Sequence, residues 1–175
     1  MSETVLRGKV WRFGDDINTD IISPAEFMDK SYEEIGRNVF GREFPGFAGA
    51  ISKGDFVVAG SNFGSGSSRE TAQIALKYAG VGAVIAKSYA RIFFRNCVNV
   101  GLPVIVFDST DVLSQGDSIE VNLGEGTITN LSDGKTYRCS KLPEHVMQIV
   151  REGGLKNYLK GYVSEKNRKI LKESL

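Results

Sequence analysis

The sequence predicts an α/β fold built on a parallel βαβαβ core with added antiparallel strands. Three short apolar runs carry this prediction: GDFVVAG (54–60), GAVIAKS (82–88) and LPVIVF (102–107). Each run is rich in β-branched residues and bounded by Gly or Pro, which is typical of strands that are buried on both faces. Because helical patterns separate the runs, we expect the three strands to be parallel and joined by right-handed crossovers.

Helical periodicity fills both gaps in this core. SSRETAQIALKYAG ends at Gly80 and gathers small and apolar side chains on one face, so this helix can sit close to the sheet. YARIFFRNCVNVG, the second crossover, also ends at a glycine. The apolar face of the first helix consists of Ala72, Ala75, Leu76 and Ala79.

The segment before the core begins with a strand. LRGKVWRFG (6–14) alternates between apolar and polar residues, as a strand with one buried face does. It leads into the loop DDINTDIISPAEFMDKS and then into a short helix near YEEIGRNV.

After the core, DSIEVNL, GTITNL and KTYRC alternate in the manner of antiparallel strands, with turns at Glu125-Gly126 and Asp133-Gly134. Two helices follow, PEHVMQIVREGG and LKNYLKGY. We divide the chain into a main domain, residues 1–161, and a charged tail, residues 162–175, which we expect to be an exposed or frayed helix.

Composition narrows the classes of function. The chain has 175 residues, 41% of them hydrophobic, and a formal net charge of +1. This charge gives no field that would attract nucleic acid or an anionic membrane. No apolar stretch approaches the length of a membrane span, and the start of the chain lacks the apolar region of a signal peptide. We therefore expect a cytoplasmic protein with neither nucleic acid nor membrane as partner.

Residues that commonly bind metals are few. Cys97 and Cys139 match no zinc or redox spacing, and Cys97 lies in an apolar segment where a buried, reduced thiol is expected. The one histidine, His145, lies in a polar stretch that is typical of a helix surface. We expect no metal site made by this chain alone.

The stretch NFGSGSSRETA (62–72) joins the first buried strand to the first helix. Gly64 and Gly66 permit positive φ, and the free N–H groups of the helix would point at the loop, which is favourable for binding an anion. A structural alternative stays open: Ser67 and Glu70 have the spacing of a capping box, which contributes about 1 kcal/mol and needs no function. Arg69 favours the anion site, because a cation at a helix start is disfavoured unless an anion is bound.

This stretch and three others resemble one family. NFGSGSSRE, IAKSYARIFFRNCVNVGLP, GKVWRFGDDINTDIISP and IVREGGLKNYL occur in the order and spacing of the small subunits of aconitase-type hydro-lyases, and are most similar to those of 3-isopropylmalate dehydratase. The resemblance covers roughly residues 7 to 160. It implies a swivelling β/β/α domain that closes over a large subunit carrying a 4Fe–4S cluster.

The resemblance also implies roles for individual residues. Ser67 matches the base that removes the proton beside a substrate carboxylate, and Asp20 matches an active-site acid that supports the loop. Arg69 matches a residue that binds a substrate carboxylate, with Ser68, Gly66 and Ser65 beside it. A 4Fe–4S cluster needs at least three thiolates and this chain has two, so the cluster is expected on the partner.

A second loop is implied to recognise the substrate's distinguishing group. Its residues here are Glu26, Phe27, Met28 and Lys30. Family members often have Arg-Tyr at the first two of these positions, as well as Cys at Ser65 and His at Thr71. The apolar pair favours an alkyl-bearing malate over an extra carboxylate, although Phe27 and Met28 also suit a role in the core.

The resulting prediction is a subunit that isomerises 2-isopropylmalate to 3-isopropylmalate by dehydration and rehydration, with a small 2-hydroxy dicarboxylic acid as substrate. Two alternatives stay open. One is a related hydro-lyase acting on a methyl-substituted malate, citraconate or homoaconitate, and the other is a free-standing module that binds an anion or nucleotide. Homo-oligomerisation of the isolated chain also stays open.

Overall fold

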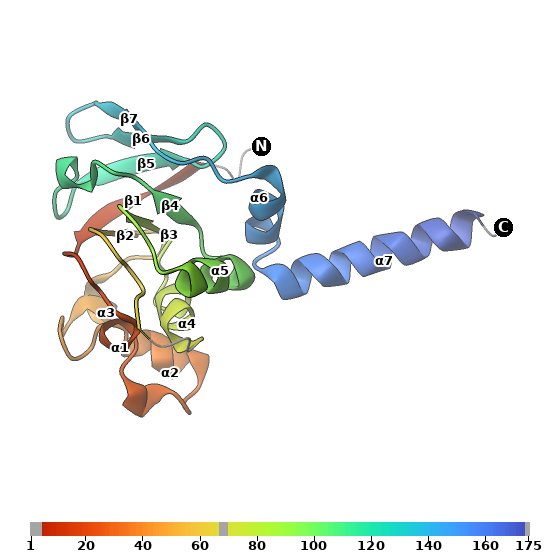
Figure 1. Ribbon diagram of the computed structural model, residues 1–175, viewed down its shortest axis with the longest axis horizontal. Helices are drawn as coiled ribbons and strands as arrows, with labels where there is room; N and C mark the ends of the chain where they lie inside the picture. Colours follow the sequence, from red (N-terminus) through yellow and green to blue (C-terminus); the bar gives the residue numbers. More distant parts are fainter. Residues whose placement is uncertain (1–4, 67–69, 174–175) are drawn as a thin grey trace.

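The computed structural model describes residues 5–66 and 70–173, with side chains through residue 164, and this part of the chain forms a seven-stranded mixed sheet (Figure 1). The strand order is β4-β3-β2-β1-β5-β6-β7. Strand β1 lies where two halves meet, because it pairs in parallel with β2 and antiparallel with β5. The strands are β1 (Val5–Arg12), β2 (Phe56–Ala59), β3 (Ala83–Ala86), β4 (Val104–Val106), β5 (Ser118–Asn122), β6 (Thr127–Asn130) and β7 (Thr136–Arg138).

The parallel half confirms the predicted βαβαβ core. Phe56 pairs with Ala83 across β2 and β3, and Ile85 pairs with Ile105 across β3 and β4. Every residue of β2 and β3 is buried, as expected for strands covered on both faces. Successive side chains alternate between two hydrophobic cores, so Phe56 belongs to one core and Val57 to the other.

One face of the sheet is covered by helices, which Figure 1 shows below the strands. Ala72, Ala75 and Leu76 are fully buried there, so the predicted apolar face of the first crossover helix is confirmed. The helix ends as expected, with Gly80 at φ +94°. The helices on this side are α1 (Thr19–Ile22), α2 (Tyr32–Arg37), α3 (Phe47–Ala50), α4 (Thr71–Tyr78) and α5 (Arg91–Val100).

The other face is covered by the antiparallel strands themselves. Ile119 and Ile128 pack in the same core as Phe56 and Ile85, so β5 and β6 curl back over the parallel half. The predicted turns are present, with Gly126 and Gly134 at positive φ. A β/β/α arrangement results, as predicted.

The C-terminal helices leave the sheet. Helix α6 (Glu144–Arg151) packs Met147 into the second core, and His145 lies exposed on it, as predicted. Helix α7 (Leu155–Glu173) projects away from the body in Figure 1. Since α7 passes residue 161 without a break, the division of the chain at this position stays a prediction. No helix among the described residues has the length and apolar content that a membrane span requires.

The structure contains short elements that the sequence did not predict. The expected loop after β1 contains α1 and the 3₁₀ helix η1 (Ala25–Phe27), and η2 (Thr110–Val112) follows β4. Helix α4 begins at Thr71, with Glu70 at its N-cap position. The capping box of Ser67 and Glu70 stays an open alternative, because Ser67 lies outside the described residues.

Candidate functional site

Two segments far apart in sequence run side by side beyond the carboxyl ends of β1 and β2. Backbone hydrogen bonds join Asp16 N to Ser61 O at 2.9 Å, Gly64 N to Ile17 O at 2.7 Å and Thr19 N to Ser65 O at 2.8 Å. The pairing brings the segment that carries Asp20 against the loop that carries Ser65 and Gly66. Ligands bind at this edge in open α/β sheets, because the strand ends and following loops leave a crevice there.

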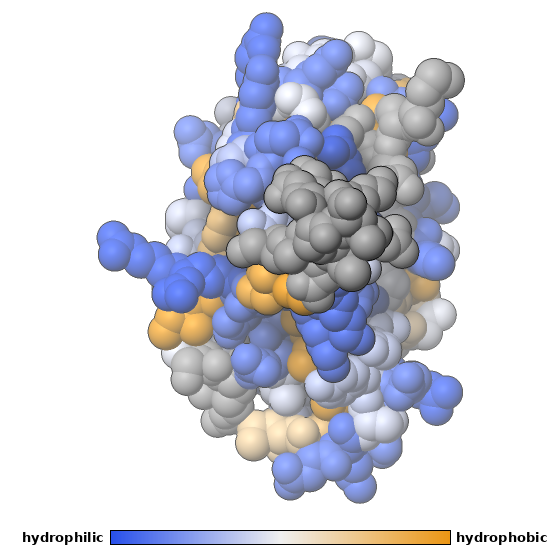
Figure 2. Space-filling model, turned by 90° about the vertical axis from the view of Figure 1, so that its right-hand side faces the viewer, coloured by the Kyte–Doolittle hydropathy of each residue, from blue (hydrophilic) through white to orange (hydrophobic). Residues whose placement is uncertain are grey.

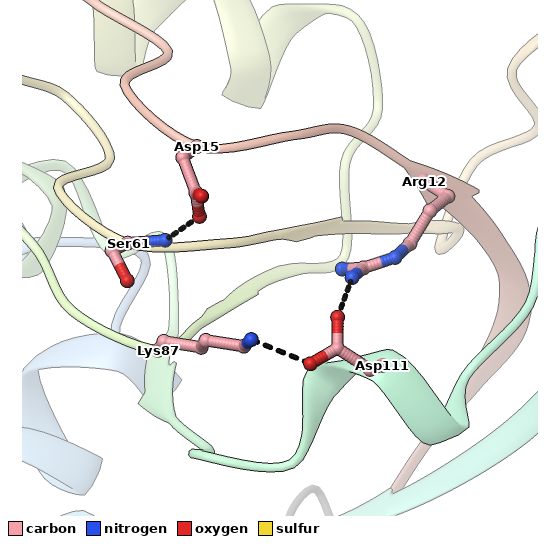
Figure 3. Close-up of polar contacts among 5 residues, drawn as sticks. All are labelled: Arg12, Asp15, Ser61, Lys87 and Asp111. Atoms are coloured by element: carbon pink, nitrogen blue, oxygen red, sulfur yellow. Dashed lines mark hydrogen bonds and ion pairs between the residues drawn. The ribbon is translucent and has the colours of Figure 1, made fainter.

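The Asp15 carboxylate holds these segments together at their start. Its Oδ1 accepts a hydrogen bond from Ser61 N at 2.6 Å, as Figure 3 shows. A Cβ placed on Gly60 would lie 1.8 Å from the same oxygen, so any larger residue there would displace this carboxylate from its hydrogen bond. One residue further along, Asn62 Nδ2 donates to Asp16 Oδ1 at 2.8 Å.

Backbone strain accompanies this contact. Asp16 has φ +56° and Asn62 has φ +60°, in the left-handed region where Asn and Asp are better tolerated than other side chains. The two residues hydrogen-bond to each other, so the strained conformation on each segment is supported by the other. Such strain is concentrated at functional sites in folded proteins.

The segment after β3 supports the loop from its other side. Asn62 N donates to Ser88 Oγ at 2.8 Å, Phe63 N donates to Ser88 O at 3.0 Å, and Ala90 N donates to Phe63 O at 3.0 Å. Below this segment, the buried Tyr89 hydroxyl lies 2.8 Å from both Val84 O and Ile105 O. Burial raises the pKa of Tyr89 well above its ordinary value, so the hydroxyl stays protonated as a structural donor.

The two loop glycines have the predicted conformation, with φ +77° at Gly64 and φ +103° at Gly66. At Gly64 a Cβ would also lie 2.1 Å from the ring of Phe93, so the loop is pressed onto helix α5. At Gly66 it would lie 3.2 Å from Thr19 Oγ1. The residue that precedes Ser67 is therefore held beside the start of helix α1.

Ser67, Ser68 and Arg69 lie outside the described residues, so their predicted roles stay predictions. The remaining predicted residues of the site can be placed. Asp20 is exposed in the first turn of α1, a helix whose N-cap Asn18 accepts from Ile21 N at 2.9 Å through its side chain. This cap and the backbone hydrogen bond from Thr19 to Ser65 together fix the position of Asp20 at the start of α1.

An ion-pair network lies at the same edge of the sheet. Asp111 accepts from Arg12 Nη2 at 2.8 Å and also binds the ammonium of Lys87 (Figure 3). The hydrogen bond from Lys87, followed by the charges of Lys87 and Arg12, holds the pKa of Asp111 below its ordinary value. The network ties the ends of β1 and β3 to helix η2.

The predicted specificity loop contains an ion pair that the sequence did not indicate. The carboxylate of Glu26 binds the guanidinium of Arg42, and this hydrogen bond raises the pKa of Arg42. Phe27 is partly buried against the helix-side core, whereas Met28 is 38% exposed and Lys30 is exposed. Of the two apolar residues, Phe27 fits a packing role and Met28 is accessible.

The cysteines do not form a metal site. Cys97 is fully buried in the helix-side core, where burial raises the pKa of its thiol well above the ordinary value. Cys139 packs against the core on the opposite face, and burial raises its pKa to about 11. Both are free, and no group of three or more His, Cys, Asp or Glu residues capable of binding a metal exists among residues 5–66 and 70–173. These residues do not fit an iron–sulfur cluster.

Sequence reasoning missed the residues that hold the site together. Asp15, Asn62 and Ser88 each bind a neighbouring segment, and Arg42 binds Glu26 of the predicted specificity loop from outside that loop. One signal was available: consecutive acids directly after a strand, at Asp15 and Asp16, are placed to bind the next strand's loop. Nothing local in the sequence indicates the pairing of Glu26 with Arg42.

Comparison with known proteins gives consistent results. Residues 21–110 match the family described as the aconitase C-terminal domain. The chain is 46% identical to 3-isopropylmalate dehydratase small subunit 1 of Thermotoga maritima over 162 residues, which cover 91% of this chain and 98% of that protein. It is 49% identical to 3-isopropylmalate dehydratase small subunit 2 of Archaeoglobus fulgidus over 155 residues, covering 87% and 93%. A crystal structure of 3-isopropylmalate dehydratase from Methanocaldococcus jannaschii has a TM-score of 0.90 at 40% identity, covering 94% of this chain and 99% of that one.

Proposed function

Since the chain belongs to the aconitase C-terminal domain family, and within it to the small subunits of 3-isopropylmalate dehydratase, we propose that it completes the active site of a hydro-lyase that isomerises 2-isopropylmalate to 3-isopropylmalate. The observation that carries the proposal is the hydrogen-bonded pairing of segments 15–20 and 61–66. It brings the segment of Asp20 to the loop that leads into Ser67.

The reaction removes a proton from the carbon beside a carboxylate and a hydroxyl group from the next carbon, and then returns water in the opposite orientation. Ser67 takes the proton and gives it back during rehydration. Arg69 binds a substrate carboxylate through two parallel donors, which fixes the reacting carbon relative to the base. Ser68, Ser65 and Gly66 line the carboxylate site, and Asp20 supports the loop from helix α1.

The departing hydroxyl needs a Lewis acid. A 4Fe–4S cluster held by a large subunit supplies it, because the two cysteines of this chain lie on opposite faces of the sheet and cannot hold a cluster. The small subunit contributes binding, proton transfer and closure over the substrate. Closure over the large subunit would take place at the sheet edge where segments 15–20 and 61–66 meet.

The substrate's alkyl group is assigned to the loop of Glu26, Phe27, Met28 and Lys30. Because the guanidinium of Arg42 is neutralised by Glu26, it presents no unpaired positive charge to a third carboxylate. The partly exposed apolar side chain of Met28 suits a branched alkyl group instead. The related substrates, a methyl-substituted malate, citraconate and homoaconitate, are the competitors to test.

The test is reconstitution. The purified chain, alone and after anaerobic mixing with a cluster-bearing large subunit, is assayed with 2-isopropylmalate, citramalate, citraconate and homoaconitate. We expect activity only in the mixture and the largest kcat/KM with 2-isopropylmalate. Turnover by the chain alone would contradict the two-subunit assignment. A larger kcat/KM with another acid would support the hydro-lyase assignment but identify that acid as the substrate. A mixture that is inactive on every acid would favour the alternative, a module that binds an anion.

A further inference from the structure

Two strained residues lie opposite each other near the start of the paired segments. Among the described residues, three non-glycine residues have positive φ, and two of them, Asp16 at +56° and Asn62 at +60°, are hydrogen-bonded to each other. The bond runs from Asn62 Nδ2 to Asp16 Oδ1 at 2.8 Å. Because an ionised carboxylate can only accept, the side-chain amide nitrogen must face it. We call these two residues the clasp.

Stability does not explain the clasp. Both side chains are exposed, so their hydrogen bond competes with water and adds little to the free energy of unfolding. The left-handed conformation costs free energy at each residue, and glycine would adopt it without steric cost. Two glycines would therefore keep the path of the backbone with less strain. The side chains are better explained by what their contact positions.

Exposure and polarity alone do not distinguish the clasp from the rest of the surface. Hydrophilic residues also predominate on the side of the molecule from which α7 projects, as Figure 2 shows. The clasp differs in combining positive φ at both residues, a direct side-chain contact, and a location between two segments of the candidate site. A residue that serves only solubility needs none of these features.

Each residue of the clasp is followed by a buried anchor. Ile17 comes after Asp16, Phe63 comes after Asn62, and both apolar side chains belong to the helix-side core. The Phe63 ring packs edge-on against Phe93 of α5, with ring centroids 5.3 Å apart. The clasp thus joins the two segments at the points where they enter the core, and it sets the direction in which each continues.

Both segments lead directly to residues of the proposed site. Asp20 lies four residues after Asp16, and Ser67 lies five residues after Asn62. Backbone hydrogen bonds continue the pairing between the segments as far as Ser65. A change at the clasp would therefore shift one segment relative to the other along this pairing.

We propose that Asp16 and Asn62 are positioning residues that keep the segment of Asp20 aligned with the loop leading into Ser67. This inference rests on the proposed function, because Ser67 is the predicted base. The clasp does not contact the substrate, and it acts by fixing the approach of the base to the carbon that loses its proton. Reactions are sensitive to such placement, since a displacement of about 1 Å can lower a rate about 100-fold.

The experiment measures kcat at saturating substrate for variants reconstituted with the large subunit, and the midpoint of urea unfolding of each variant. Asn62→Asp removes the donor and places two carboxylates opposite each other, so kcat should fall about 10-fold. The exchanged pair, Asp16→Asn with Asn62→Asp, restores one donor and one acceptor and should recover most of this loss. The midpoints should stay close to that of the parent, because the bond is exposed.

Two further variants complete the comparison. Asn62→Gly keeps the left-handed conformation without the side chain, so its unfolding midpoint should stay close to that of the parent while kcat falls about 10-fold. It also replaces Asn62→Asp if that variant does not fold. Asn99→Asp, at an exposed position on α5, adds the same charge elsewhere and should change neither kcat nor the midpoint.

The outcomes separate this inference from the proposed function. If the parent pair is active, unchanged kcat in both Asn62 variants would overturn the clasp alone, and so would an exchanged pair no more active than Asn62→Asp. A fall in kcat that accompanies an equally clear fall in the unfolding midpoint of Asn62→Gly would make the clasp merely structural and also overturn the inference. A parent pair that is inactive on every acid would overturn the proposed function and this inference with it.

Discussion

The Asp15 carboxylate oxygen that accepts from Ser61 N occupies the space that any side chain on Gly60 would enter, at 1.8 Å from the position of its Cβ. The contact between the Asp15 carboxylate and Ser61 N therefore depends on residue 60 having no side chain. It is the first of a series of bonds that align segment 15–20 with segment 61–66.

Gly60→Ala is therefore expected to displace the Asp15 segment. Overpacking of this kind costs about 1–3 kcal/mol, and we expect the free energy of unfolding, measured in urea, to fall by that amount. Activity of the reconstituted pair should fall with it, because Asp20 and Ser65 would lose their alignment. Gly14→Ala is the matched control, since no atom lies within 4 Å of its Cβ position. The double variant Gly60→Ala, Asp15→Gly should recover part of the stability; equal stability of the Gly60 and Gly14 variants would contradict the account.

Ser67 is predicted to act as the base and not as a helix cap. Helix α4 begins at Thr71, four residues beyond, and Glu70 stands at its N-cap position. Ser67→Ala should then lower turnover of the reconstituted enzyme by about 100-fold or more, as removal of a positioned base does, with a melting temperature near that of the parent. Ser67→Asn should be equally inactive, since an amide cannot take the proton. Near-normal turnover by the asparagine variant, measured on a sample that binds substrate, would exclude Ser67 as the base.

Arg69 is predicted to bind a substrate carboxylate through two parallel donors. Lysine keeps the charge but not this geometry, so Arg69→Lys should raise KM and lower kcat while the unfolding midpoint stays unchanged. Arg37→Lys, at an exposed position on α2, is the control and should alter neither constant. A large fall in the melting temperature of the Arg69 variant with normal kinetics would assign it a structural role instead.

Asp55 is predicted to make stability depend on pH on the acid side. Its Oδ1 accepts from Lys9 N at 2.8 Å, and its Oδ2 accepts from Trp11 Nε1 at 3.0 Å and Ser52 N at 2.9 Å. Burial alone would raise the pKa of this carboxyl, but the three bonds together outweigh burial and hold the pKa below its ordinary value. The stabilisation is therefore complete above the unfolded-state pKa, about 3.9, and is lost as the pH falls toward the lower folded-state pKa.

Asp55→Asn should lower the free energy of unfolding at pH 7 by about 1–3 kcal/mol, because an amide group cannot accept all three bonds. The variant should also lose part of the acid dependence, so that its deficit relative to the parent narrows between about pH 5 and pH 3. Urea unfolding at several pH values measures both effects. Glu125→Gln, at an exposed turn, serves as control and should keep the acid dependence of the parent. If the loss of unfolding free energy in Asp55→Asn instead grows as the pH falls, the pKa of Asp55 is raised and not lowered in the folded state.

The buried strands and their crossovers were predictable because each is encoded locally. The β-branched runs bounded by Gly or Pro predicted β2, β3 and β4, and the small side chains of Ala72 and Ala75 predicted the buried face of α4. The positive φ of Gly64 and Gly66 followed from the residue type at a strand-to-helix junction. Signals of this kind need no knowledge of what a segment contacts.

The parts that were missed depend on contacts between distant segments. Asp15 binds Ser61 across 46 positions, and Glu26 binds Arg42 across 16, and neither partner can be chosen from local pattern. Helix α1 is four residues long and is fixed by Asn18 and by the bond from Thr19 to Ser65, not by intrinsic helix propensity.

The two edge strands of the sheet affect how readily the chain aggregates before it binds a partner. Strands at sheet edges present unpaired backbone groups that invite aggregation with other chains. Here both edge strands, β4 and β7, have three residues, and Val106 of β4 is already engaged, since its N–H donates to Ser140 Oγ and its carbonyl accepts from Ser140 N. A subunit that is synthesised separately from its partner must remain soluble until the two associate. Edge strands that are short and already partly hydrogen-bonded offer few backbone groups with which another chain could form a sheet.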